Sequence, residues 1–175
     1  MKNVISIRPA TATDCTTIAA LGKQTFVETY GEVSPKESLD QYLKAKFSPE
    51  KIAEELSNPD ERFFIAFVDE MPVGFTKLRY DRIPKNLSNK KAIELERIYV
   101  LREHQGSSVG KELMNRCKEI AKSEKFDLVW LQVWQDNHRA IQFYQKSGFV
   151  IYDTAIFNFA DIKHKDYLMR FDLYL

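Results

Sequence analysis

The chain has 175 residues, of which 44% are hydrophobic and 29% are charged, as is typical of a soluble globular protein with one sizeable core. Its 26 Lys and Arg residues nearly balance its 25 Asp and Glu residues, for a formal net charge of +1. Non-specific nucleic-acid binding depends on a large positive field, so we expect no nucleic-acid partner. For the same reason, a cationic ligand has to be met by a local acidic patch.

Cysteine content and the N-terminus indicate the cellular compartment. Cys15 and Cys117 have no motif spacing and are expected to be reduced thiols. The first residues turn polar too soon for a signal peptide, and no segment approaches the roughly 20 apolar residues that span a bilayer. We therefore predict a cytoplasmic protein without a membrane partner, folded as a single domain over residues 1–175.

The first third of the chain is predicted to be one strand followed by helices. Alternating residues in Val4–Arg8 indicate the strand, and apolar residues at helical spacing in Asp14–Tyr30 indicate a helix. The run Ser34–Glu37 (SPKE) predicts a capping box that opens a second helix, with serine at the N-cap and proline at the first helical position. Ser48-Pro49 repeats the cap signal before a third helix at Lys51–Leu56.

The remainder alternates between strands and helices. Strands are predicted at Arg62–Val68, Val73–Tyr80, Ala92–Val100 and Leu128–Trp134, and around Phe149–Phe159 and Lys165–Leu173. Helices are predicted near Ser108–Ser123 and at Asn137–Ser147, and a polar loop at Asp81–Lys90. This order predicts an α+β fold with one largely antiparallel sheet and helices on both of its faces.

The segment Glu94–Met114 combines a strand, a loop of small residues and the start of a helix. A helix N-terminus presents main-chain N–H groups at the positive end of the helix dipole, which makes it a natural anion site. Lys111 adds a positive charge. The residues without bulk, which would let a pyrophosphate approach the main chain, are Gly106, Ser107, Ser108 and Gly110. Taken alone, the pattern is also that of an ordinary turn.

Two motifs resemble the signatures of the GCN5-related N-acetyltransferases, the GNAT family. Gln105–Gly110 (QGSSVG) resembles the pyrophosphate loop Q/R-x-x-G-x-G/A, with Ser108 in place of the first glycine. Trp130–Phe149 resembles the second signature, L-x-V-x-x-x-N-x-x-A-x-x-F-Y-x-x-x-G-F, in which the asparagine is Asn137 and the tyrosine Tyr144. The resemblance implies the GNAT fold with a bulged central strand, and acetyl-CoA as cosubstrate.

The likeness is strongest to the bacterial spermidine/spermine N-acetyltransferases of the PaiA type. It extends to Thr25–Tyr30 and Glu94–Val100. At the C-terminus it rests on Phe157, Asp161, Asp166 and Met169, with Ala160 in place of a glycine. The resemblance implies that a small-molecule primary amine, such as spermidine or spermine, is acetylated, although likeness of fold does not determine the substrate.

The resemblance also implies a role for each residue of the cofactor site. Main-chain groups of the strand end, Ile98, Tyr99 and Val100, would pair with the pantetheine arm. The pyrophosphate loop would comprise Gln105, Gly106, Ser107, Ser108, Val109, Gly110 and Lys111. Asn137 would contact the pantetheine or the acyl carbonyl region, and is otherwise simply a helix N-cap. Tyr144 would protonate the leaving thiolate, and is otherwise a packed aromatic residue.

The reaction needs a base, because a primary amine with a pKa near 10.4 is almost fully protonated at neutral pH. Glu94 and Glu96 are the candidates, because their spacing of two places both on one face of the central strand. Either is alternatively a salt-bridged residue of the sheet. The carboxylates expected to flank the acceptor amine are Glu28, Glu32 and Asp81 together with Glu94, and each is alternatively a solvated surface charge.

Other interpretations remain open at this stage. His104, His138 and His164 are scattered, so no metal site is predicted. A second interpretation is acetylation of protein N-termini or other peptide amines, because ribosomal-protein acetyltransferases share both motifs. A third interpretation is an acyl-CoA-binding regulator that has lost turnover. A homodimer is compatible with the sequence, which does not decide the oligomeric state.

Overall fold

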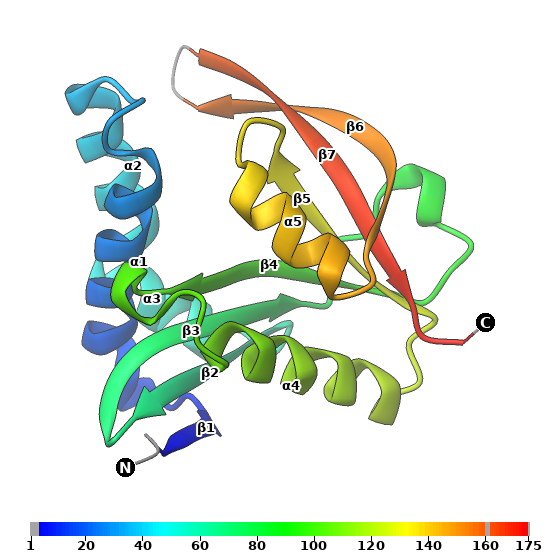
Figure 1. Cartoon of the computed structure of the whole chain (residues 1–175), viewed down its shortest axis with the longest axis horizontal. Helices are drawn as coiled ribbons and strands as arrows, with labels where there is room; N and C mark the ends of the chain where they lie inside the picture. Colours follow the sequence, from blue (N-terminus) through cyan, green and yellow to red (C-terminus); the bar gives the residue numbers. More distant parts are fainter. Residues whose placement is uncertain (1–3, 160–161, 175) are drawn as a thin grey trace. The chain divides into compact units, whose positions relative to one another are not determined.

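The computed structural model describes residues 4–159 and 162–174, and its elements follow the predicted order (Figure 1). The helices are α1 (Cys15–Tyr30), α2 (Lys36–Phe47), α3 (Pro49–Ser57), α4 (Val109–Ser123) and α5 (His138–Lys146). The strands are β1 (Ile5–Pro9), β2 (Glu61–Val68), β3 (Met71–Arg79), β4 (Ala92–Val100), β5 (Leu128–Trp134), β6 (Val150–Phe159) and β7 (Ile162–Asp172). Short 3-10 helices are η1 (Ala12–Asp14), η2 (Lys85–Leu87) and η3 (Arg102–His104).

The described strands form a seven-stranded mixed sheet in the order β1-β2-β3-β4-β5-β7-β6. Only one of the described pairings, β4 with β5, is parallel, and its register runs from Ala92↔Leu128 to Glu94↔Trp130. The pairs β1–β2, β5–β7 and β7–β6 are antiparallel. Asp69 and Glu70, with φ of 47° and 69°, form the tight turn between β2 and β3. The predicted α+β class is confirmed.

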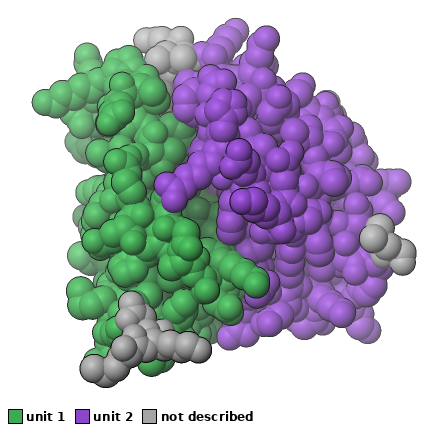
Figure 2. Space-filling model, viewed as in Figure 1, with its two compact units in different colours: residues 1–78, 97–113 green, residues 79–96, 114–175 purple. Residues whose placement is uncertain are grey.

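By its internal contacts the chain divides into two compact units (Figure 2). Unit 1 comprises residues 1–78 and 97–113, and unit 2 comprises residues 79–96 and 114–175. The boundaries fall inside β4 and α4, so each of these elements contributes residues to both units.

An aromatic cluster forms the helical core of unit 1, where α1 packs on α2 and α3 (Figure 1). The ring of Phe47, which is fully buried, lies 5.9 Å from Phe26, 6.4 Å from Tyr42 and 6.1 Å from Tyr99, measured between ring centroids. Gly22 makes room for this ring, because a Cβ atom at that position would lie 2.2 Å from it. Tyr99 thereby ties the end of β4 to the helices.

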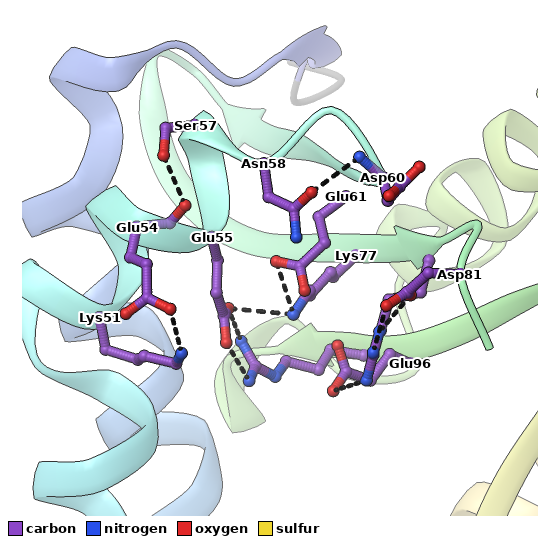
Figure 3. Close-up of polar contacts among 12 residues, drawn as sticks. Lys51, Glu54, Glu55, Ser57, Asn58, Asp60, Glu61, Lys77, Asp81 and Glu96 are labelled. Atoms are coloured by element: carbon purple, nitrogen blue, oxygen red, sulfur yellow. Dashed lines mark hydrogen bonds and ion pairs between the residues drawn. The ribbon is translucent and has the colours of Figure 1, made fainter.

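Buried charges form a second contact between the sheet and the helices of unit 1 (Figure 3). The Glu55 carboxylate on α3 accepts hydrogen bonds from Arg97 of β4 at 2.7 and 3.2 Å. Lys77 of β3 lies 3.1 Å from both Glu55 and Glu61. A buried charge is tolerated only when it is paired, so these residues hold α3, β3 and β4 in one arrangement.

The side chains of β4 do not alternate regularly, which agrees with the predicted bulge. Lys77 and Arg79 lie two residues apart on β3 and therefore point to the same face. Lys77 and Arg97 share Glu55 as partner, while Arg79 lies 3.7 Å from Glu96. The consecutive residues Glu96 and Arg97 thus both pair with that face, as a classic bulge allows and a regular strand does not.

In unit 2, apolar side chains of the sheet are covered by the loop between β3 and β4. The buried cluster consists of Leu87, Ala92, Leu128, Trp130 and Leu168, with Tyr152 and Ala155 packed against it. The loop is also attached by polar contacts, because the Trp130 indole N–H donates to the Arg82 carbonyl at 3.3 Å. Burial raises the pKa of the Tyr152 phenol to about 12.

The end of α5 agrees with the prediction for Gly148, whose φ is +90°. The Phe149 N–H donates to the Tyr144 carbonyl at 3.0 Å and the Gly148 N–H to the Gln145 carbonyl at 2.9 Å, which is a Schellman motif. Lys118 of α4 donates to the Ser147 carbonyl, and its burial lowers the pKa of this ammonium group. A cation at a helix C-terminus is favoured by the helix dipole.

Of the two predicted serine caps, one is confirmed and one is wrong. Ser48 accepts a hydrogen bond from the Lys51 N–H at 3.2 Å and caps α3. Ser34 does not cap α2, which begins only after Pro35, a residue with extended backbone and without a side-chain cap bond. The Ser34 N–H instead donates to the Tyr30 carbonyl at 3.0 Å, so this residue belongs to the turn that follows α1.

Replacement of Asp14 tests the anchor of the chain entering α1. Its carboxylate accepts hydrogen bonds from Arg8 at 2.8 and 2.9 Å and from the Thr11 N–H at 2.7 Å. The Arg8 guanidinium holds the pKa of Asp14 near 2, below its usual 3.8. A lowered pKa contributes stability above the unfolded value and loses it as pH falls towards the folded value.

We therefore expect Asp14→Asn to reduce the free energy of unfolding by about 1–2 kcal/mol at pH 7. The difference from the native chain should shrink as pH falls from about 4 to about 2, because the Asp14 carboxylate then becomes protonated. Urea titrations across this pH range measure it, with Asp40→Asn, at an exposed position of α2, as the control. A deficit that is constant with pH would contradict the assignment.

Gly74 permits the close approach of β3 to the end of β4. A Cβ atom at this position would lie 2.6 Å from the Tyr99 carbonyl oxygen and 3.2 Å from the Val100 Cα, both main-chain atoms that cannot rotate away. We expect Gly74→Ala to lower stability by about 2–3 kcal/mol. Gly106→Ala, with φ of +83° but open space around the added Cβ, should cost only about 1 kcal/mol. Equal losses in thermal unfolding would argue against the steric account.

Candidate active site

The predicted cofactor residues in unit 1 lie at the end of β4 and at the start of α4. Ile98, Tyr99 and Val100 are half-buried at the end of the strand. The Gln105 side-chain amide donates to the Val100 carbonyl at 2.9 Å, so one acceptor position of that carbonyl is occupied. Gln105 thus folds the loop back onto the strand, a role that the motif alone does not reveal.

The loop itself is exposed and takes its required conformation at a glycine. Gly106 has a φ of +83°, which favours glycine, and Ser108 is not among the described residues with positive φ. Serine in place of the family's glycine therefore introduces no left-handed strain. The Ser107 hydroxyl lies 3.4 Å from the Val109 N–H, and Val109 is fully buried, so the helix start is anchored beneath the loop.

The first turn of α4 has the properties of an anion site. The Glu112 N–H donates to the Ser108 carbonyl at 2.9 Å and makes the first bond of the helix. The N–H groups of Gly110 and Lys111 precede it and have no intrahelical acceptor. The Lys111 side chain is exposed beside them. These donors, the helix dipole and the lysine charge fit a pyrophosphate group.

Glu28, predicted to face the substrate, is used inside unit 1 to position the loop. Its carboxylate accepts from the Arg102 main-chain N–H at 2.8 Å and from the Gln24 amide at 3.1 Å, and the Arg102 guanidinium donates to the Glu28 carbonyl. Arg102 opens η3, the turn between β4 and the loop. Glu32, which was also predicted to flank the acceptor amine, is exposed.

In unit 2, Asn137 and Tyr144 lie on α5. Asn137 is the N-cap of this helix, and its Oδ1 accepts from the Ala140 N–H at 3.2 Å. It therefore has the capping role that was the alternative to contact with the cofactor. Tyr144 is half-buried, with its ring 5.5 Å from Phe143 and 6.0 Å from Phe149. The Schellman turn and Lys118 fix the far end of this helix, so Tyr144 is carried on a helix secured at both ends.

The candidate bases are both ion-paired with arginines of unit 2. Glu94 is only 2% exposed and lies 2.9 Å from Arg82. Glu96 lies 3.7 Å from Arg79, which also forms a two-point contact with Asp81 at 3.1 and 3.0 Å (Figure 3). Both glutamates are therefore salt-bridged residues of the sheet, which is the alternative role that the sequence allowed for them.

A chain of hydrogen bonds links Glu94 to three polar residues of unit 2 that the sequence motifs do not indicate as site residues. The Arg82 guanidinium also donates to the Gln132 side-chain oxygen at 3.3 Å, and the Gln132 amide donates to Asp166 at 2.8 Å. Asp166 was noted only as part of the C-terminal pattern, and nothing in its spacing indicated these contacts. Ala160 and Asp161 of the same pattern lie outside the described residues.

In the described part of the chain, no group of three or more His, Cys, Asp or Glu residues is placed to hold a metal ion. Over the same residues, no helix combines the length and apolar character needed to cross a membrane.

Comparison with known proteins identifies the family. Residues 23–149 match the family described as the Acetyltransferase (GNAT) family. A spermidine N(1)-acetyltransferase of Thermoplasma acidophilum is 30% identical over 86% of this chain and 91% of its own length. An uncharacterised N-acetyltransferase of Lactobacillus delbrueckii subsp. lactis is 26% identical over 86% of this chain and 87% of its own length.

The structural comparison agrees. The PaiA N-acetyltransferase of Thermoplasma acidophilum, crystallised in complex with coenzyme A, matches 97% of this chain and 99% of its own chain, with a TM-score of 0.80 and 27% identity. The strand, loop and helix that resembled a pyrophosphate site thus occur in a fold solved with coenzyme A. This chain belongs to the GNAT family and is an acetyl-CoA-dependent N-acetyltransferase.

Proposed function

We propose that this N-acetyltransferase transfers the acetyl group to a primary amine of a polyamine such as spermidine or spermine. The observation that carries the proposal is the likeness to a spermidine N(1)-acetyltransferase, which extends over 86% of this chain at 30% identity. The fold-wide match to a PaiA N-acetyltransferase supports it. Two buried carboxylates in unit 2, Glu94 and Asp166, are candidates for the acidic patch that a polycation needs.

Acetyl-CoA would be held by the unit 1 residues already described. Its pyrophosphate would be bound by the main-chain N–H groups of the loop and first turn of α4, residues 105–111, with Lys111 as a counter-charge. The strand end, residues 98–100, would pair with the pantetheine arm as an added strand does. The acetyl thioester supplies the electrophile. Gly106 and Gly110 have no side chain, so they leave the main chain of this segment accessible to the pyrophosphate.

The amine nitrogen would attack the thioester carbonyl directly. The pKa of the amine lies about 3.4 units above pH 7, so its deprotonation costs roughly 4.6 kcal/mol. Glu94 or Glu96 would take the proton directly or through water. Tyr144 would give a proton to the departing thiolate. A phenol with a pKa near 10 is a fitting donor for a thiolate with a pKa near 8.5, because the transfer is close to balanced.

Steady-state assays of CoA release with several amines test the substrate class. We expect spermidine and spermine to give kcat/KM values at least tenfold above those of an N-terminal alanine peptide. Preference for the peptide would instead support acetylation of protein N-termini. Tight acetyl-CoA binding without turnover on any amine would support a non-catalytic regulator.

Removal of the Tyr144 hydroxyl tests the proton donor. We expect Tyr144→Phe to lower kcat by about 10²–10⁴, the range for loss of a general acid, with the KM for acetyl-CoA nearly unchanged. Tyr174→Phe makes the same chemical change at an exposed position of unit 2 and should leave kcat unaltered. If Tyr144→Phe retains the native kcat, the residue packs α5 and does not donate the proton.

A further inference from the structure

Glu94, Gln132 and Asp166 form a polar row across three neighbouring strands of unit 2. They lie on β4, β5 and β7, which are adjacent in the sheet. The Gln132 amide donates to Asp166 Oδ2 at 2.8 Å, and its side-chain oxygen accepts from Arg82 at 3.3 Å. Arg82 donates to Glu94 at 2.9 Å. Gln132 therefore contacts Asp166 directly and is linked to Glu94 through the Arg82 guanidinium, while the Arg79 guanidinium also interacts electrostatically with Glu94.

Among the described residues, the Asp166 carboxylate has one buried oxygen atom that is not used as a hydrogen-bond acceptor. Its side chain belongs to a residue that is 5% exposed, and within the described part of the chain its buried Oδ1 atom has no hydrogen-bond partner. Burial raises the pKa of this carboxyl group, with the Gln132 amide opposing the shift. An acceptor buried without a donor is costly to retain, so such an atom in a native site calls for a specific explanation.

Arg82 occupies the opposite end of the row with a side chain that is 49% exposed. Its guanidinium carbon lies 5.3 Å from the centre of the Trp130 ring, over which a cation is attracted. Its main chain is held separately, through the Trp130 indole bond to its carbonyl. The guanidinium can therefore move away without release of the loop. Its departure would expose the groups that it now contacts, which are the Glu94 carboxylate, the Gln132 side-chain oxygen and the Trp130 ring.

We propose that Glu94, Gln132 and Asp166 form a subsite for an alkylammonium group of the acceptor, and that Arg82 covers this subsite until that ammonium displaces its guanidinium. The inference rests on the proposed function, which it deepens by assigning the acidic patch. Carboxylates favour the protonated amine, so the group bound is one that does not attack the thioester. The assignment gives Glu94 to substrate binding and leaves Glu96 as the candidate base.

Titration calorimetry with spermidine on the CoA-loaded protein tests the subsite. Asp166→Asn keeps the shape of the side chain and removes its charge, and we expect at least tenfold weaker spermidine binding. Asp172→Asn is the control, because it makes the same change on the same strand at a residue paired with Arg170. Its affinity for spermidine should stay within twofold of the native value. Equal affinities of native protein and Asp166→Asn would overturn the subsite.

Two further variants keep the test decisive. Arg82→Gln alters a half-exposed side chain and should tighten spermidine binding about threefold or more, since the competing cation is gone. Unchanged or weaker binding would overturn the covering role of Arg82. Should circular dichroism show that Asp166→Asn is unfolded, Gln132→Met carries the test of the subsite. It should weaken spermidine binding at least threefold, and native affinity would overturn the proposal.

The subsite and the proposed function fail in different ways. Native protein that acetylates spermidine while Asp166→Asn binds it equally well would leave the function standing and remove the subsite. Native protein that binds spermidine through Asp166 but transfers no acetyl group to it would keep the subsite and remove the function. If native protein does not bind spermidine, the subsite is overturned, and the amine panel shows which acceptor remains.

Discussion

The buried carboxylate of Glu55 is the constraint on which unit 1 depends. It binds Arg97 of β4 by two hydrogen bonds and Lys77 of β3 by a third contact, so α3 and two strands meet at one group. Loss of any partner would leave a charge uncompensated in the interior, which usually costs several kcal/mol. The arrangement therefore specifies one position for Arg97, and the strand end and cofactor loop follow directly along the chain.

The order of the elements was predictable because it depends on local patterns. Apolar spacing located the helices, Ser48 marked the start of α3 through its own hydroxyl, and Gly148 marked the end of α5 through its left-handed backbone. Ser34 misled because the same residue types also suit the turn after α1, where its N–H is used. A local signal fails where two neighbouring structures compete for one residue.

The contacts of the candidate site were harder to predict because they join residues far apart in sequence. Glu55 and Arg97 are 42 residues apart, and Gln132 and Asp166 are 34 apart. Period-two spacing placed Glu94 and Glu96 on one face, but it could not foresee the irregularity at Arg97 or the arginine beside each glutamate. The loop was predictable as a likeness, whereas the hydrogen bond from Gln105 to Val100 was not.

The near-neutral net charge is accompanied by contacts within the chain that bind several of its carboxylates. The Glu94 and Asp81 carboxylates are ion-paired with Arg82 and Arg79, and the Glu28 carboxylate accepts from the main-chain N–H of Arg102. Two carboxylates of the acidic patch expected for a cationic ligand are thus neutralised by the chain's own arginines. An incoming cation has to compete with a tethered one, so selectivity depends on which internal pairs can open.

The division of β4 and α4 between the two units has a consequence for folding. Because the chain passes from one unit to the other within these elements, neither unit is a continuous segment that can be synthesised or excised alone. Unit 1 cannot be completed until residues 97–113 have emerged and returned to the N-terminal portion, so much of its stability depends on sequence-distant contacts. Such topologies raise contact order and slow folding. A nascent chain halted before this return would expose the apolar faces of β2 and β3, the kind of surface from which aggregation begins.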